Sequence, residues 1–176
     1  LGFWENLGTP KKINLVELGA GNGEMMKIFL ETFKKFPAFL SSCNILIHEK
    51  SLKLKKIQKN KLDKEKVIWI SDLKEIKKFP TIFIANEFFD AIAIKQFIKK
   101  KDLWFERYVS LKNKKKAFFY ENKFNMKKFE KEIDYNISKN QKFIEYSLVG
   151  TNYLKKVAEI VKKNNGGLLM IDYGYM

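Results

Sequence analysis

The sequence has very few of the side chains on which many enzyme centres depend. Its 176 residues include one cysteine, Cys43, and one histidine, His48. A single cysteine excludes an intrachain disulfide and a cysteine zinc site, and a single histidine gives a Ser-His-Asp triad or a histidine metal cluster little to build on. We therefore expect no bound metal, and many hydrolases and zinc enzymes are excluded.

Arginine is as scarce as histidine. Arg107 is the only one, so lysine supplies nearly all of the positive charge behind the formal net charge of +15. A basic chain can indicate a nucleic-acid or anionic-membrane surface, but such surfaces more often carry arginine on one concentrated face. The lysines here are scattered over the whole chain, which is typical of a genome whose base composition favours lysine codons. We therefore expect no nucleic-acid partner.

Long apolar runs are also missing. No run reaches the length of a membrane span and no signal peptide opens the chain, so we expect a bacterial cytoplasm, with the mitochondrial matrix as the alternative. The chain starts at Leu1 and stops directly after a predicted strand, so we expect a piece of a longer protein. What is present is a 45% hydrophobic composition, enough for one folded domain with a real core.

Short apolar segments alternate with helical patterns along much of the chain. Strands are predicted at residues 12–18, 44–49, 67–71, 81–89 and 166–174, and helices at 24–36, 50–62 and 151–164. The helix at 50–62 is basic, with Leu52, Leu54 and Ile57 as its apolar points. This alternation predicts an α/β fold with a doubly wound, mostly parallel sheet that is covered on both faces.

The pattern changes between residues 95 and 146. Segments 103–111 and 115–122 predict an antiparallel pair joined by a lysine-rich turn at 112–116, and a short helix is predicted near 126–133. We expect one domain over residues 1–176, incomplete at both ends, with this insertion after the fourth strand. Insertions there lie above the carboxyl ends of the strands, where open α/β sheets bind ligands.

The loop after the first strand gives the first chemical signal. In NLVELGAGNGEMM, Gly19, Gly21 and Gly23 follow Glu17. A dinucleotide loop would need glycine at position 24, where Glu24 would repel a pyrophosphate, and no Gly-Lys-Ser/Thr follows to make a Walker loop. An acid followed by a glycine loop suits a ligand with a positive end and no phosphates. S-adenosylmethionine (SAM) is such a ligand, and Glu17 can help to hold its ammonium group.

Two further acids follow the next two strands. Glu49 ends the second strand, where a carboxylate can accept two hydrogen bonds from a ribose diol. Asp72 closes the third strand, where it can accept from an adenine amino group. For each acid the alternative is a helix N-cap. The glycine loop and the two acids together favour a SAM site.

The stretch ANEFFDAIAIKQF places Asn86, Glu87 and Asp90 at the end of the fourth strand. Buried carboxylates are costly unless they are paired or used, so we expect these polar residues to face a methyl acceptor. A guanidinium acceptor would want carboxylates for orientation and charge, and one of them can take the proton released on methylation. The alternative is that Glu87 or Asp90 caps the next helix, and Phe88 and Phe89 are expected to be core.

Several segments resemble the MidA-like family of class I SAM-dependent methyltransferases, whose mitochondrial members help to assemble respiratory complex I. The segments are WENLGTPKKINLVELGAGNGEMM, ANEFFDAIAIKQF, WFERYV, EYS and GGLLMIDYGY, in the family's order, and the resemblance spans about residues 4 to 175. It implies a protein-arginine N-methyltransferase that uses SAM and acts on an arginine of a complex I core subunit.

The resemblance also implies roles for individual residues. SAM would be bound by Glu17, Gly19, Gly21, Gly23 and Glu49, with its adenine touching Asp72 and Leu73. The acceptor pocket would be shaped by the catalytic candidates Asn86, Glu87 and Asp90, and lined or braced by Gln96, Glu106, Arg107 and Asp172. For Arg107 the alternative is an ion pair with Glu106 or with a core acid across the hairpin.

Some positions depart from the family pattern. Ala20 and Asn22 stand where the family commonly has proline and arginine, and Ala93 stands where proline is usual. We expect the family's N-terminal segment and the last two strands of the class I sheet to be missing, which would leave the strand at 166–174 on an exposed edge. Two other functions stay open: an RNA methyltransferase, and a non-catalytic assembly factor that keeps the fold.

Overall fold

The structure is a computed structural model that describes residues 1–112 and 116–173. It divides into two compact units, one of Leu1–Ala91 with Asn152–Met176 and one of Ile92–Thr151. The second unit contains the segment 95–146 that the sequence predicts to be an insertion. That the whole chain forms one domain stays a prediction.

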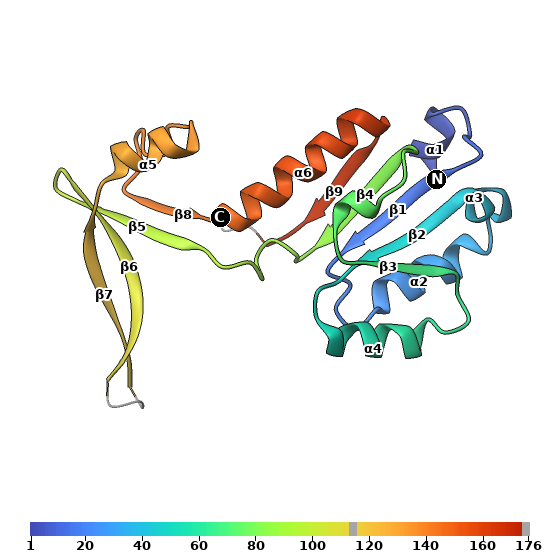
Figure 1. Ribbon diagram of the computed structural model, residues 1–176, viewed down its shortest axis with the longest axis horizontal. Coiled ribbons are helices and arrows are strands. Elements are labelled where there is room, and N and C mark those ends of the chain that lie inside the picture. The colour runs from blue at the N-terminus through green and yellow to red at the C-terminus, as the bar shows by residue number, and fades with distance from the viewer. Residues whose placement is uncertain (113–115, 174–176) are drawn as a thin grey trace. The chain divides into compact units, whose positions relative to one another are not determined.

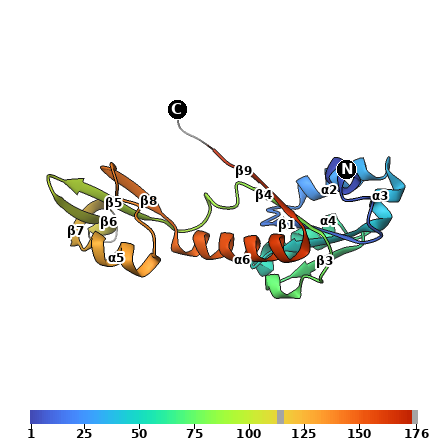
Figure 2. The same cartoon turned by 90° about the horizontal axis from the view of Figure 1, so that it is seen from above.

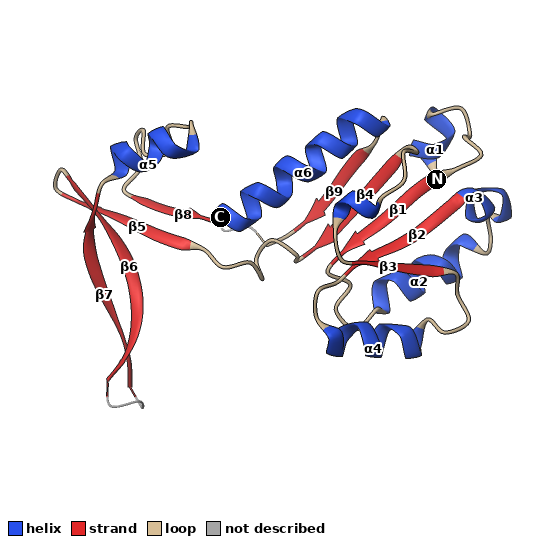
Figure 3. Ribbon diagram, viewed as in Figure 1, coloured by secondary structure: helices blue, strands red, loops and turns tan. Residues whose placement is uncertain are grey.

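A five-stranded parallel sheet forms the centre of the first unit (Figure 1, Figure 3). Its strand order is β3-β2-β1-β4-β9, and all four pairings are parallel. The strands are β1 Ile13–Leu18, β2 Cys43–His48, β3 Val67–Ile70, β4 Thr81–Asn86 and β9 Gly167–Ile171. The predicted doubly wound, mostly parallel sheet is therefore confirmed, and β9 lies at an edge of it.

Helices cover both faces of this sheet. They are α1 Gly2–Asn6, α2 Glu24–Phe33, α3 Pro37–Ser42, α4 Leu52–Lys61, a 3-10 helix at Leu73–Glu75, and α6 Leu148–Asn164. Met26 of α2 packs with Leu15 of β1 in one core cluster, and Val157 of α6 packs with Val16 of β1 in another. Because successive side chains of a strand point to opposite faces, β1 is buried from both sides. Figure 2 shows α2 and α6 on the two sides of the sheet.

The second unit is a four-stranded antiparallel sheet of order β7-β6-β5-β8. Its elements are β5 Lys95–Lys100, β6 Leu103–Lys112, β7 Lys116–Phe124, α5 Met126–Ile133 and β8 Phe143–Tyr146. Phe97, Trp104 and Met126 form its small core. The predicted antiparallel pair and the short helix are confirmed, while residues 113–115 of the predicted turn lie outside the described part of the chain.

Some elements differ from the prediction. The sequence does not predict α1, α3, β5 or β8. The strand predicted over 81–89 ends at Asn86, because Glu87 has a φ of 50°, in the left-handed region that cannot continue a strand. On α4, Leu52 is 82% exposed and Ile57 39% exposed, and the buried residue is Gln58. Within the described ranges, no helix is both long and apolar enough to cross a membrane.

Candidate functional site

The loop between β1 and α2 has the backbone that its glycines permit. Gly19, Gly21 and Gly23 all have positive φ values, of 67°, 53° and 81°. A Cβ at Gly19 would lie 2.7 Å from Cδ2 of Phe88, whereas a Cβ at Gly21 would have no atom within 4 Å. The loop is therefore packed tightly at its first glycine and open at its second. An open backbone without side chains allows a ligand to approach closely.

Glu17 lies near the carboxyl end of β1 and is only 2% exposed. Its Oε2 is buried and has no hydrogen-bond partner in the described part of the chain. Burial raises the pKa of Glu17 from 4.5 to about 7, because the carboxylate loses its hydration without gaining a partner. A buried acid with a free acceptor beside an open glycine loop fits the ammonium group of SAM.

Glu49 follows β2 and is also buried, but its carboxylate is paired. Oε1 accepts from the Ser51 amide at 2.8 Å, and Oε2 accepts from Nε2 of Gln58 at 3.1 Å. The N-cap of α4 is Ser51, whose Oγ accepts from the Leu54 amide at 3.3 Å. Glu49 is therefore not the N-cap. Each carboxylate oxygen can accept more than one hydrogen bond, so Glu49 can still take hydroxyl donors.

Asp72 follows β3 and does cap a helix. Its Oδ1 accepts from the Lys74 amide at 2.9 Å, while Oε1 of Glu75 accepts from the Asp72 amide at 2.8 Å. The Lys74 amide is the main cause that lowers the pKa of Asp72. Asp72 is exposed and the adjacent Leu73 is buried. The N-cap alternative is thus observed for Asp72. Asp72 nevertheless lies at the carboxyl end of β3, which pairs with β2.

Asn86 ends β4, Glu87 and Asp90 follow it, and all three are exposed. The expectation that these residues are buried is wrong, because the chain turns outward at the left-handed Glu87. The Glu87 amide donates to the Ile171 carbonyl at 2.8 Å, which ties this turn to β9. Phe88 and Phe89 pack against the core cluster of α6 and the sheet, as expected.

Tyr173 shows that acids from two strand ends lie near one another. Its pKa is raised, chiefly by the side chain of Glu87, and further by the charges of Asp90 and Asp172. Glu87 and Asp172, two acids for which the sequence predicts a place at the acceptor, lie at neighbouring strand ends, because β4 pairs with β9 and the Glu87 amide donates to the Ile171 carbonyl. They lie beside Tyr173, a phenol that is 77% exposed.

Gln96, Glu106 and Arg107 lie in the second unit and have partners there. Gln96 donates to Glu145 at 2.8 Å, and Glu106 accepts from Lys95 at 2.7 Å. Arg107 donates to Glu121, across the hairpin, at 3.4 Å. Of the two alternatives for Arg107, the pair with an acid across the hairpin is the one observed.

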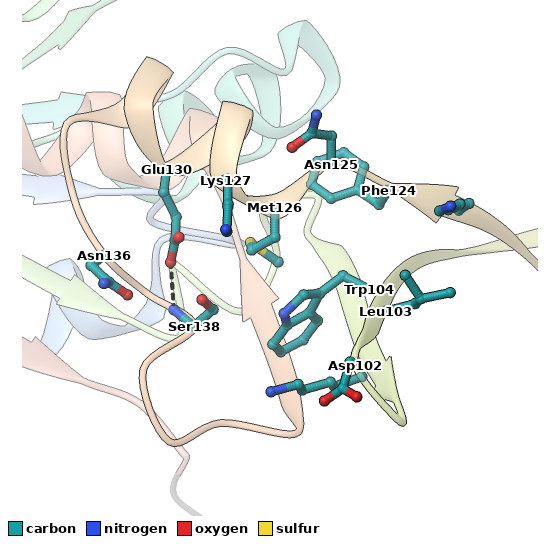
Figure 4. Close-up of a pocket in the computed structure, with 12 residues that line it drawn as sticks. Asp102, Leu103, Trp104, Phe124, Asn125, Met126, Lys127, Glu130, Asn136 and Ser138 are labelled. Carbon is teal, nitrogen blue, oxygen red and sulfur yellow. Dashed lines mark hydrogen bonds between the residues drawn. The ribbon is translucent and has the colours of Figure 1, made fainter.

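The second unit also has a pocket of about 750 Å³, shown in Figure 4. Trp104, Phe124 and Met126 line it, and within it Glu130 accepts from the Ser138 amide at 2.8 Å. Gln96, Glu106 and Arg107 are not among its lining residues. Over the described residues, no group of three or more histidine, cysteine, aspartate or glutamate side chains could hold a metal ion.

The sequence does not predict a role for two buried polar residues near the strand ends, His48 and Gln58. His48 ends β2, and its Nε2 lies 3.2 Å from the Tyr153 hydroxyl. Burial is the main cause that lowers its pKa. Gln58 contacts both the glycine loop and Glu49. No sequence signal marks Gln58, because it stands in a lysine-rich helix and its partners are distant along the chain.

Comparisons with known proteins identify the family of the chain. A family described as "Putative S-adenosyl-L-methionine-dependent methyltransferase" matches residues 1–176. The Xenopus laevis protein named protein arginine methyltransferase NDUFAF7, mitochondrial, is 29% identical over 98% of this chain and 45% of its own length. The human protein of that name is 30% identical over 61% of this chain and 30% of its own length. The chain thus spans less than half the length of these curated relatives.

A solved structure gives the same picture of the fold. A crystal structure from Burkholderia thailandensis, bound to S-adenosyl-homocysteine, matches with a TM-score of 0.71 and 18% identity, over 99% of this chain and 44% of that one. At this identity the match shows the fold alone, which is that of a class I methyltransferase. With the family match over its whole length, the chain belongs to the MidA-like family of SAM-dependent methyltransferases that its motifs indicate.

Proposed function

We propose that this chain forms the SAM-binding part of a protein-arginine N-methyltransferase. The observation that carries the proposal is the buried, unpartnered Oε2 of Glu17 next to the open glycine loop. A buried carboxylate of this kind is unfavourable unless a ligand uses it. The ammonium group of SAM would supply the missing partner.

The remaining strand-end residues of the first unit would hold the rest of the cofactor. Glu49 would accept from the ribose hydroxyls, and the backbone of Gly19, Gly21 and Gly23 would contact the methionine part. Asp72 would accept from the adenine amino group while it caps its helix, and the buried Leu73 would contact the adenine ring. These roles follow the order of the strands, from β1 through β2 to β3, at one edge of the sheet.

The acids after β4 and β9 would hold the acceptor. Glu87, Asp90 and Asp172 are all exposed and all raise the pKa of Tyr173, so a guanidinium can reach them. Carboxylates bind guanidinium groups through charge-assisted hydrogen bonds. Asn86 would add an amide contact. For Gln96, Glu106 and Arg107, which have partners of their own, the role we propose is to brace the second unit.

The chemistry assigned to these residues is proton removal and orientation. When bound, SAM supplies a methyl group on a positively charged sulfur, which a guanidinium nitrogen can attack. The nitrogen that gains the methyl group must lose a proton, and Glu87 or Asp90 would accept it. Carboxylates on the acceptor also balance the positive charge that an arginine brings to a cationic cofactor.

The acids also favour a protein acceptor over RNA. Three acids near one another at the acceptor side would repel a phosphodiester backbone, whereas they attract a cationic side chain. The curated relatives are named protein arginine methyltransferases. The resemblance to the MidA-like family further suggests an arginine of a respiratory complex I core subunit as the target. Those relatives are named mitochondrial, and for this chain a bacterial cytoplasm stays the prediction, with the mitochondrial matrix as the alternative.

The test is transfer of a labelled methyl group from SAM to a protein extract, followed by amino-acid analysis. We expect label in methylarginine, and Glu87→Gln with Asp90→Asn should abolish transfer while SAM binding persists. Glu132→Gln, at an exposed glutamate of α5, is the matched control and should keep full transfer. Label in RNA alone would replace the proposal with an RNA methyltransferase, and SAM binding without any transfer would leave the non-catalytic assembly factor.

A further inference from the structure

Gln58 is the most buried residue of α4, a helix otherwise rich in exposed lysines. Its side chain is 0% exposed. A buried amide is costly unless its hydrogen-bonding groups are paired. The Gln58 amide forms hydrogen bonds with Trp69, Gly21 and Glu49, all in the first unit. Gly21 and Glu49 are residues assigned to SAM.

The orientation of the Gln58 amide follows from its neighbours. Nε1 of Trp69 lies 2.9 Å from Oε1 of Gln58. An indole N–H can only donate, so the amide atom facing Trp69 must be the oxygen. The amide nitrogen then faces the other way, toward the Gly21 carbonyl at 2.8 Å and Oε2 of Glu49 at 3.1 Å.

These contacts use both N–H groups of the amide. One N–H holds the backbone of the glycine loop at Gly21, and the other holds the carboxylate of Glu49. The stem of Gln58 also supports the loop, because a Cβ at Gly23 would lie 3.4 Å from its Cγ. One side chain therefore sets the distance between the glycine loop and the acid assigned to the ribose.

We propose that Gln58 is a positioning residue, which fixes Glu49 and the glycine loop in the arrangement that receives the ribose end of SAM. The inference rests on the proposed function. Glu49 is restrained at Oε1 by the Ser51 amide and at Oε2 by Gln58. With both oxygens restrained, the carboxylate cannot rotate freely, and its remaining lone pairs are held in fixed directions.

The test is calorimetric titration of the chain with S-adenosyl-homocysteine and with its 2′-deoxy analogue. Gln58→Met keeps the length of the side chain and removes its hydrogen bonds. We expect about tenfold weaker binding of S-adenosyl-homocysteine, and a smaller preference for it over the 2′-deoxy analogue. A residue that only stabilised the fold would weaken both ligands by the same factor.

A double-mutant cycle with Glu49→Ala tests the route of the effect. If Gln58 acts through Glu49, Gln58→Met should change the affinity by much less when Glu49 is already alanine. Trp69→Phe keeps an aromatic ring and removes only the N–H that orients the amide, so it should reduce the same preference to a lesser degree. This variant answers the question if Gln58→Met does not fold. Gln141→Met, at an exposed glutamine, is the matched control and should bind as the parent does.

The outcomes separate the inference from the proposed function. If the parent chain binds S-adenosyl-homocysteine while Gln58→Met keeps both its affinity and its preference, Gln58 has no positioning role and the proposed function stands. If Gln58→Met and Trp69→Phe lose affinity equally for both ligands, the role is structural and the inference is overturned. If the folded parent chain binds neither ligand, the proposed function fails and takes the inference with it.

Discussion

Glu17 and Glu49 are buried acids of neighbouring strand ends, yet they are satisfied in opposite ways. Both oxygens of Glu49 accept hydrogen bonds, whereas Oε2 of Glu17 has no partner within the described residues. Burial without a partner raises the pKa of Glu17 to about 7. The charge of Glu17 should therefore respond to the arrival of a cation.

The stability of the folded chain should depend on the protonation of Glu17. The folded protein holds this proton up to about pH 7, while the unfolded chain releases it near 4.5. Stability from this group is therefore fully present below pH 4.5 and is lost as the pH rises to 7. Glu17→Gln keeps a neutral amide, so above pH 7 it should be more stable than the parent by up to about 3 kcal/mol.

Urea unfolding of the parent and of Glu17→Gln at pH 5 and pH 8 measures this difference. The comparison between the two proteins cancels the titration of all other groups. A difference in unfolding free energy that stays constant between the two pH values would show that the pKa of Glu17 is not raised.

Ligand binding should depend on Glu17 in the opposite direction. The ammonium of S-adenosyl-homocysteine attracts the ionised carboxylate, so affinity should rise as the pH increases from 6 to 7.5, and binding should release a proton. Calorimetry in two buffers with different ionisation enthalpies measures that proton. In Glu17→Gln the affinity should be lower and almost independent of pH over this range. Proton uptake by the parent on binding would contradict the assignment.

Substitution by alanine should destabilise the fold more at Gly19 than at Gly21. Both have positive φ, which disfavours alanine by roughly 1 kcal/mol or more. Gly21→Ala meets open space, whereas Gly19→Ala also meets Phe88 at 2.7 Å. We expect Gly19→Ala to lose about 3 kcal/mol of stability and Gly21→Ala about 1 kcal/mol.

Denaturant unfolding of the two single variants measures both values. Adding Phe88→Leu should recover part of the stability lost in Gly19→Ala, since the clash is with the aromatic ring. Equal losses in both variants would show that the contact between Gly19 and Phe88 is not tight.

The phenol of Tyr173 should report the charge of Glu87. Glu87 is the main cause of the raised pKa of Tyr173, so Glu87→Gln should lower that pKa. Ultraviolet absorbance of phenolate against pH measures the change. The chain has 7 tyrosines, so the signal of Tyr173 is taken as the difference from Tyr173→Phe. A curve unchanged by Glu87→Gln would mean that the two side chains are not neighbours.

The parallel sheet could be predicted because its strands are short apolar runs separated by helices. Two strands of the second unit could not. β5, with the sequence KQFIKK, buries only Phe97, and β8 has four residues. Neither gives a periodic signal, because their places depend on pairing with strands that lie elsewhere in the chain. Local sequence contains little information on such pairings.

The strand-end acids could be predicted from position, but not their environments. The sequence leaves the N-cap role open for Glu49 and, more strongly, for Asp72, and only Asp72 caps a helix. β4 ends earlier than predicted because Glu87 has a left-handed backbone. Glutamate is not a residue type that predicts this conformation. Gln58 was missed because its contacts depend on residues 9, 11 and 37 positions away.

The central place of β1 has a consequence for dynamics. This strand is hydrogen-bonded on both edges, to β2 and β4, and covered on both faces. Its amide protons should exchange with deuterated solvent only when the whole unit unfolds, so they should report the global free energy of unfolding. The amides of the glycine loop, which directly follows β1, can exchange by local opening. A ligand that binds there should therefore slow exchange in the loop directly, and it should slow exchange in β1 only as far as it raises the free energy of global unfolding.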